Sequence, residues 1–245
     1  MGEAENLEKD LRMGTAILEW ELGDIIGHVG VRLPDNEGIA VKLLRVDQED
    51  KYQDWMTRFD FDGNKLSGTG TVPGEAVIYT KLFAARPEVN AIVHAHAPMC
   101  VVMGLAGIPI SGVHLQSAKF GTGMPVYPLP MYVSNEHDGD EVVKTIGDGP
   151  AMTINGHGIV VAGKSIDEAV ITALYMERAA KVQYAARNLG FTGVSEEFEN
   201  VLAGNREKIM ERGANIDRPK TGHSDEWRYY SRKIEQGETW SRSWT

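Results

Sequence analysis

The sequence has little cysteine and a shortage of basic residues, and both shortages narrow the kinds of protein it encodes. Cys100 is the only cysteine among 245 residues, so no disulfide can form within the chain and a reducing cytoplasm is the expected compartment. The 25 Lys and Arg residues are outnumbered by 35 Asp and Glu residues, giving a formal net charge of -10 and a pI of about 5.2. This balance argues against a general nucleic-acid binder. It does not exclude a small anionic substrate, because a pocket can be locally positive in a protein of negative net charge.

Long apolar runs are also missing from the sequence. The longest uncharged stretch, residues 89–115, is interrupted by Asn90, three histidines and two prolines, so it predicts a core strand and helix rather than a membrane span. The N-terminal residues MGEAENLEKDLR are acidic and helical in pattern, which is not typical of a signal peptide. We therefore expect no association with a membrane.

The composition that remains is that of a globular α/β domain. Apolar residues make up 42% of the chain and charged residues 24%, and no composition break divides it. We predict a catalytic domain over residues 1–212 and a C-terminal aromatic tail over residues 213–245. The tail carries several large aromatic side chains and should pack on the domain or on a neighbouring subunit, since many exposed aromatics are unusual; they are Trp227, Tyr229, Tyr230, Trp240 and Trp244.

Apolar periodicity and turn residues predict the order of the elements. Helices are expected over residues 3–22, 75–86, 98–106, 165–190 and 195–212. Strands are expected over residues 27–32, 39–46, 89–96, 124–127, 130–133, 151–154 and 159–162. Residues 47–65 are polar and irregular, and residues 107–150 are rich in glycine and proline, so neither segment predicts a helix.

One strand carries an unusual pair of histidines. His94 and His96 stand two residues apart in the apolar run VNAIVHAHAP, so both imidazoles project from the same face of a strand. His157 lies between two glycines at a tight turn between two predicted strands, and Glu75 opens the helix that precedes the histidine strand. Three imidazoles form a set typical of a catalytic metal with an open position, and a nearby carboxylate could bind the metal or move protons.

Each of these residues also has a structural interpretation when taken alone. A single histidine is more often structural than a ligand, and Glu75 by itself would be a solvated acid favoured by the helix dipole. The remaining histidines, His28, His114, His137 and His223, carry no local signal. The glycine-rich loop at residues 67–74 lacks the Lys-Ser/Thr ending of a P-loop and indicates only a turn.

Taken together, Glu75, His94-Ala95-His96 and Asn155-Gly156-His157-Gly158 resemble the class II aldolase/adducin family, with the likeness covering about residues 8–190. The resemblance implies an α/β fold of three layers, α/β/α, with a central, largely antiparallel sheet. It also implies that His94, His96 and His157 bind one divalent metal ion (Zn, Mn, Fe or Co) and that Glu75 is the catalytic carboxylate. The family commonly forms homotetramers with sites at subunit interfaces, where the C-terminal tail can reach a neighbour's site.

Two departures from the family pattern bear on the substrate. Phosphate-using members have Gly-Asn-x-Ser after the first helix, whereas residues 27–30 here are Gly-His-Val-Gly. Those members also place hydroxyl residues directly before the glutamate, but Val72-Pro73-Gly74 stand there and Thr71 is further away. A phosphate needs several donors, so these absences argue against a sugar phosphate.

The Gly-His-Val variant and the aromatic tail look like the decarboxylase branch of the family, which acts on ortho-hydroxylated aromatic dicarboxylates such as 3,4-dihydroxyphthalate or a hydroxy-methylpyridine dicarboxylate. By this resemblance the chain is a lyase of aromatic compound catabolism, whose metal stabilises the carbanion or enolate formed when CO2 leaves. Glu75, in a pocket that raises its pKa, would donate a proton to the carbon. His28 and Thr71 would bind substrate, and Tyr230 or Tyr229 would act as a donor from the tail.

Two other functions stay open at this point. The same metal chemistry serves an aldolase, epimerase or dehydratase acting on a sugar or sugar phosphate. A non-enzymatic, adducin-like interaction module would have no need of the histidines, and all three are present. Metal content separates this module from both enzymes, and the reaction product separates the enzymes from each other.

Overall fold

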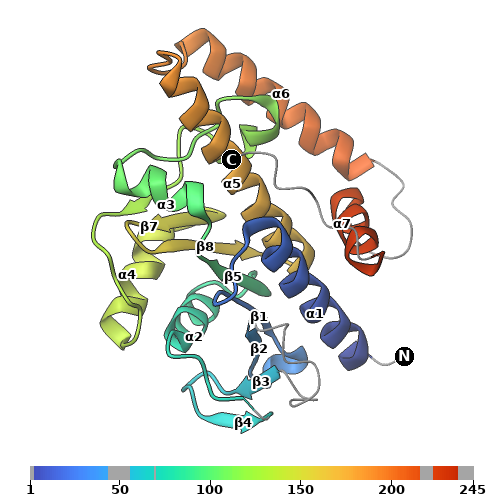
Figure 1. Ribbon diagram of the computed structural model, residues 1–245. Coiled ribbons are helices and arrows are strands. Elements are labelled where there is room, and N and C mark those ends of the chain that lie inside the picture. Colours follow the sequence, from blue (N-terminus) through green and yellow to red (C-terminus); the bar gives the residue numbers. More distant parts are fainter. Residues whose placement is uncertain (1–2, 44–55, 69, 216–222, 237–245) are drawn as a thin grey trace.

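The computed structural model describes residues 3–43, 56–68, 70–215 and 223–236 (Figure 1). Its α-helices are α1 (Glu3–Leu22), α2 (Ala76–Ala85), α3 (Pro98–Leu105), α4 (Glu136–Ile146), α5 (Ile166–Asn188), α6 (Glu196–Asn215) and α7 (Asp225–Glu235). Its strands are β1 (His28–Arg32), β2 (Ile39–Leu43), β3 (Met56–Phe59), β4 (Lys65–Ser67), β5 (Ala91–Ala95), β6 (Val126–Tyr127), β7 (Ala151–Ile154) and β8 (Gly158–Gly163). Short 3-10 helices lie at η1 (Pro34–Asn36) and η2 (Leu115–Phe120).

The described strands form one sheet in the order β4-β3-β2-β1-β5-β8-β7-β6. Every neighbouring pair is antiparallel except β6 and β7. The histidine strand β5 therefore lies in the interior, between β1 and β8, where backbone hydrogen bonds hold it on both sides. In this register His94 is opposite His28 on β1 and opposite Val160 on β8.

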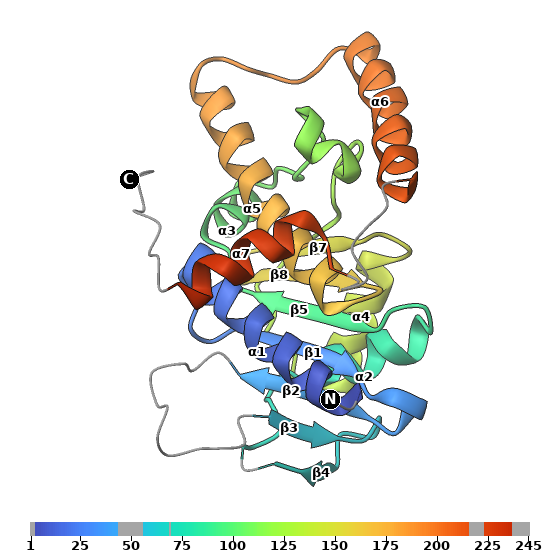
Figure 2. The same ribbon diagram turned by 90° about the vertical axis from the view of Figure 1, so that its right-hand side faces the viewer.

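Helices cover both faces of this sheet (Figure 2). Helices α1, α3, α5 and α7 pack on one face, and α2 and α4 pack on the other. Successive residues of β5 alternate between these layers: Val93 and Ala95 belong to the core beneath α1 and α5, and Ile92 belongs to the core beneath α2. His94 follows the same alternation and faces the α2 side. The predicted three-layer architecture with a largely antiparallel sheet is confirmed.

The prediction that residues 47–65 are irregular is wrong for the part that the structure describes. Met56–Phe59 form β3, whose Met56, Thr57 and Phe59 are almost fully buried, and β4 follows it. A strand covered on both faces has no polar alternation, so pairing with β2, and not its own pattern, defines it. The predicted strand at 39–46 is observed as far as Leu43, and its last residues lie outside the described residues.

The segment 107–150 contains a helix that its composition conceals. Helix α4 begins after Asn135, whose side chain accepts a hydrogen bond from the backbone N–H of Asp138. Gly139, a poor helix former, lies where α4 crosses Val77 and Lys81 of α2, so a side chain there would collide with α2. The strand predicted at 130–133 does not form, although β6 forms within the strand predicted at 124–127.

The C-terminal region contains two helices. Helix α7 packs on α1 and α5, with Trp227 and Tyr230 buried in that contact (Figure 2). Trp240 and Trp244 lie outside the described residues. The division into a domain at 1–212 and a tail at 213–245 stays a prediction. Searched over the described part of the chain, no helix has the length and hydropathy that crossing a membrane requires.

Candidate metal centre

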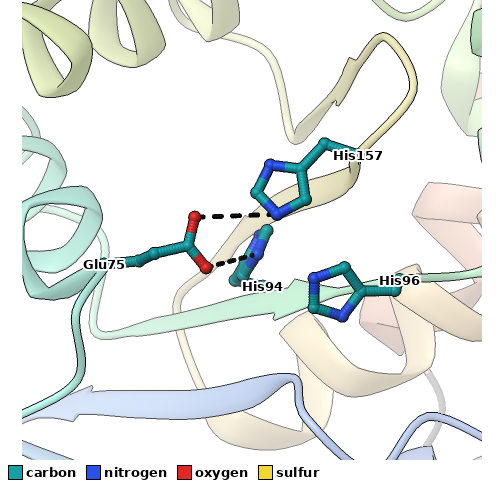
Figure 3. A group of neighbouring side chains, drawn as sticks. All are labelled: Glu75, His94, His96 and His157. Carbon is teal, nitrogen blue, oxygen red and sulfur yellow. Dashed lines mark ion pairs between the residues drawn. The ribbon is translucent and has the colours of Figure 1, made fainter. Parts of the chain in front are cut away.

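Four side chains predicted from the sequence meet at one point of the fold (Figure 3). Glu75 stands at the N-cap of α2, His94 lies in β5, His96 directly follows β5, and His157 lies in the turn between β7 and β8. Each side chain offers one nitrogen or oxygen atom, and these atoms all lie within 4.8 Å of one another. The rigid sheet thus brings together residues that are up to 82 positions apart, because 157 minus 75 is 82.

Backbone carbonyls orient two of the histidines. Nδ1 of His94 lies 3.0 Å from the carbonyl oxygen of Ile159, and Nδ1 of His157 lies 2.7 Å from that of Met131. A carbonyl oxygen only accepts, so each Nδ1 must carry a proton. These hydrogen bonds leave the lone pair of each Nε2 directed into the cluster, as metal-binding imidazoles require.

Asp24 orients the third histidine. Its carboxylate lies 3.2 Å from Nδ1 of His96 and accepts the backbone N–H of the same residue at 2.6 Å. The backbone N–H of Ile26 donates to the same carboxylate. Burial alone would raise the pKa of Asp24, but the hydrogen bonds from His96 and Ile26 outweigh it and hold the pKa well below its usual range. Asp24 was not predicted from the sequence, where its only local signal is that it is the one acid in the apolar, glycine-flanked stretch at 23–27.

Nε2 of His94 shows that this arrangement fits a cation. It lies 3.2 Å from Oε2 of Glu75, and His94 is fully buried. Within the described residues this nitrogen has no hydrogen-bond partner. A neutral Nε2 and a carboxylate oxygen are both acceptors, so two of them facing each other in a buried site are costly unless a positive charge lies between them. Three imidazoles and a carboxylate suit Zn2+, Mn2+, Fe2+ and Co2+ alike.

The prediction that the pocket raises the pKa of Glu75 is wrong. Burial does raise it, but positive charge on the histidine side of the site, at His94 and then at His157, together with the backbone N–H of Val133, outweighs burial and lowers the pKa of Glu75 to about 2. The contacts behind this shift are 3.2 Å to His94, 3.6 Å to His157 and 3.3 Å to Val133. Glu75 is therefore a carboxylate in this structure, ready to bind a cation or accept a proton.

His28 lies beside the cluster. Its ring centroid is 5.7 Å from that of His94 across the β1–β5 pair, and the residue is only 8% exposed. Burial, the largest cause, lowers the pKa of His28 to about 3, so it is a neutral imidazole. Thr71 is exposed in the loop before Glu75, and its carbonyl accepts a hydrogen bond from Thr57. The substrate-binding roles of His28 and Thr71 stay predictions.

The fold does not bring Tyr230 to this cluster within one chain. Tyr230 packs in the core of α1, α5 and α7, where its hydroxyl accepts a hydrogen bond from Arg178, while His94 faces the opposite side of the sheet. Burial raises the pKa of Tyr230 to about 12, so its hydroxyl stays protonated. Tyr229 beside it is exposed. A role for Tyr230 in a neighbour's site stays a prediction.

The segment at 131–133 forms one wall of the site, although its sequence does not predict this role. The carbonyl of Met131 orients His157, and the N–H of Val133 donates to Glu75. Between them, the exposed Tyr132 places its hydroxyl against Gly74, leaving no space there for a side chain. Two of these contacts are made by backbone groups. Every residue type has a backbone carbonyl, and every type except proline has an N–H, so the sequence does not reveal such contacts.

Replacing Asp24 by asparagine should weaken metal binding without unfolding the protein. The amide keeps the shape of the carboxylate but removes the charge that holds Nδ1 of His96. Changes at such outer positions typically cost about 10- to 100-fold in metal affinity, and we expect a loss in that range in a chelator competition titration. Asp138→Asn, an equivalent change at the start of α4, is the matched control. Equal affinity in the two variants would remove Asp24 from the site.

Comparison with known proteins identifies the class to which this fold and site belong. Residues 19–184 match the family model described as "Class II Aldolase and Adducin N-terminal domain", and the chain belongs to this family. Among solved structures, an L-fuculose 1-phosphate aldolase superposes with a TM-score of 0.71 at 20% identity, covering 84% of this chain and 98% of the other. An aldolase II superfamily protein from Pseudomonas syringae gives 0.73 at 18% identity, covering 97% and 98%. These likenesses define the fold.

Relatives in sequence are more specific. The chain is 32% identical over 181 residues to a 3,4-dihydroxyphthalate decarboxylase of Arthrobacter keyseri, covering 68% of this chain and 72% of the relative. It is 30% identical over 185 residues to the protein of the same name from Rhodococcus jostii (strain RHA1), covering 69% and 74%. Decarboxylases and aldolases are both lyases, so the comparisons support an enzyme. The family and the Glu/His cluster together support a divalent metal.

Proposed function

We propose that the protein is a metal-dependent decarboxylase of an ortho-hydroxylated aromatic carboxylate or dicarboxylate. The observation that carries the proposal is the set of three oriented Nε2 atoms around an ionised Glu75, in a chain similar over two-thirds of its length to decarboxylases. The proposal is further supported by the absence of side-chain donors that a phosphate would need. Glycine stands at position 30, and Val72-Pro73-Gly74 stand directly before Glu75.

In this proposal His94, His96 and His157 hold one divalent ion, Zn, Mn, Fe or Co. When bound, that ion supplies the positive charge that stabilises the electron pair left behind as CO2 departs. Glu75 begins as a carboxylate, in agreement with its lowered pKa, and accepts the proton of a ring hydroxyl. It then returns this proton to the carbon that has lost CO2, so the carbon–carboxyl bond is replaced by a carbon–hydrogen bond. This order differs from the expectation that Glu75 starts as an acid.

His28 is suited to bind the substrate. As a neutral, nearly buried imidazole next to His94, it can donate one hydrogen bond to a carboxylate oxygen. Thr71, in the loop before Glu75, is placed at the exposed side. We further propose a cytoplasmic homotetramer, in which Tyr230 or Tyr229 of the tail approaches a neighbour's site. Light scattering coupled to size exclusion measures the subunit number directly.

Incubation of metal-loaded protein with 3,4-dihydroxyphthalate tests the proposal. We expect CO2 release that stops when a chelator removes the metal and returns when the metal is restored. L-fuculose 1-phosphate serves as the parallel substrate, and we expect no cleavage of it. Cleavage of the sugar phosphate without CO2 release from any ortho-hydroxylated aromatic acid would instead establish an aldolase, epimerase or dehydratase. A protein that binds no divalent ion would be an adducin-like module.

A further inference from the structure

Tyr132 is an exposed aromatic residue that lies between two backbone contacts to the metal centre. The carbonyl oxygen of Met131 accepts a hydrogen bond from His157, and the N–H of Val133 donates to Glu75. The side chains of Glu75 and His157 face each other, with Oε1 and Nε2 3.6 Å apart (Figure 3). Met131 and Val133 pack into the core beneath α2 and α4, whereas Tyr132 is 64% exposed. Tyr132 therefore stands on the wall of the site without being part of the core.

The hydroxyl end of Tyr132 lies against Gly74, the residue directly before Glu75. A Cβ atom added to Gly74 would overlap the Tyr132 hydroxyl oxygen and lie 3.3 Å from its Cζ, and it would meet no other described heavy atom within 4 Å apart from its chain neighbours. The backbone of Gly74 does not need glycine, because its φ is not among the positive ones. Among the described residues, Tyr132 is thus what the missing side chain at position 74 accommodates.

These two contacts give the tyrosine ring a defined place. The backbone of Tyr132 belongs to the segment that contacts His157 and Glu75, and its hydroxyl reaches the loop that leads into Glu75. A single exposed aromatic residue on a protein surface needs no explanation. One that reaches between two parts of a candidate active site presents a flat, apolar surface close to Glu75. Such a surface favours another flat ring, because aromatic pairs gain from offset stacking or edge-to-face contact.

We propose that Tyr132 is a specificity-determining residue, whose ring packs against the aromatic ring of the substrate and so favours it over an aliphatic acid with the same polar groups. This role rests on the proposed function, because it requires an aromatic substrate. Gly74 contributes to the same role, since a side chain there would displace the tyrosine ring from its place next to Glu75. The ring of Tyr132 makes the contact, and its hydroxyl is not required for it.

Binding of 3,4-dihydroxybenzoate to zinc-loaded protein, measured by calorimetry, tests the role of the ring. This acid remains when 3,4-dihydroxyphthalate loses the carboxylate next to a hydroxyl, so the reaction does not consume it. We expect its dissociation constant to rise about 3- to 12-fold in Tyr132→Ala and to change less than about twofold in Tyr132→Phe. Tyr184→Ala removes an exposed tyrosine of α5 and is the matched control, with no change expected. Glycerate has two adjacent hydroxyls and a carboxylate but no ring, and it should bind all four proteins equally.

Gly74→Ala tests the place of the ring. The added methyl group collides with the Tyr132 hydroxyl, so the variant should bind 3,4-dihydroxybenzoate more weakly than the wild type does. In a Tyr132→Phe background the hydroxyl is gone, and the same change should have a clearly smaller effect. Equal weakening in both backgrounds would show that the methyl group acts without the tyrosine, and it would remove Gly74 from the proposal.

The outcomes separate the role of Tyr132 from the proposed function. An unchanged dissociation constant in Tyr132→Ala overturns the role of Tyr132, even if the wild type releases CO2 from 3,4-dihydroxyphthalate. Equal weakening of glycerate and of the aromatic acid overturns it too, since the lost contact is then not one to a ring. A wild type that binds glycerate as tightly as 3,4-dihydroxybenzoate also overturns it, and the absence of CO2 release in that protein would count against the proposed function as well.

Discussion

Replacement of His94 by alanine is expected to abolish metal binding and activity together. His94 is fully buried, and its Nε2 is the one nitrogen of the cluster that is buried without a hydrogen-bond partner in the described part of the chain. The change removes one of three imidazoles and leaves the Glu75 carboxylate without the neighbour that lies 3.2 Å away. We expect the metal affinity to fall more than about 100-fold, the upper end of the loss seen for outer positions, and CO2 release to become undetectable.

Metal content measured after dialysis, together with CO2 release, checks this result. His137→Ala is the matched control, because His137 is an exposed histidine on α4 away from the cluster. Circular dichroism and thermal unfolding of both variants in chelator separate a lost ligand from a lost fold, since neither variant then carries metal. Retained turnover in His94→Ala would refute the assignment of the metal centre.

Replacement of Glu75 by glutamine should leave the metal bound but lower the turnover number by about 100- to 10,000-fold. The glutamine side chain has nearly the same shape, and the three imidazoles remain to hold the ion. It cannot accept a proton from a substrate hydroxyl, however, and it cannot return one to carbon. The expected result is therefore a variant with wild-type metal content and a large loss in the rate of CO2 release.

Glu177→Gln is the control for this change. Glu177 is an equally buried glutamate, but it accepts backbone N–H groups of Met99 and Cys100 at the start of α3, on the other side of the sheet. We expect it to leave turnover close to wild type. Full activity in Glu75→Gln would remove Glu75 from the mechanism, and loss of the metal in that variant would make Glu75 a ligand rather than a proton carrier.

Much of the fold was predictable because its elements carry their own patterns. The apolar spacing of α1, α2 and α5 and the continuous apolar runs of β5, β7 and β8 correspond closely to the predicted ranges. Strand β3 and helix α4 were not predictable in the same way. β3 is covered on both faces and is defined by its pairing with β2, and α4 carries Gly139 at the position where it crosses α2. In both, a tertiary contact overrides local preference.

The candidate site also contains some residues that the sequence predicts and some groups that it does not. His94, His96, His157 and Glu75 were predictable from residue type and spacing, because metal binding requires particular side chains. The groups that orient these side chains were not: the carbonyls of Ile159 and Met131 act through the backbone. Asp24 reaches His96 across 72 positions of the chain.

The sequence by itself determined the family, the four cluster residues and the absence of several phosphate donors, because these depend on which side chains are present and how they are spaced. Only the tertiary structure decided how those side chains are used. It ionises Glu75, directs the three Nε2 atoms inward, brings the ring of His28 next to that of His94 and puts Tyr230 on the opposite face of the sheet. Protonation and tautomer depend on burial and on the nearest donors and acceptors, and folding alone brings those groups together.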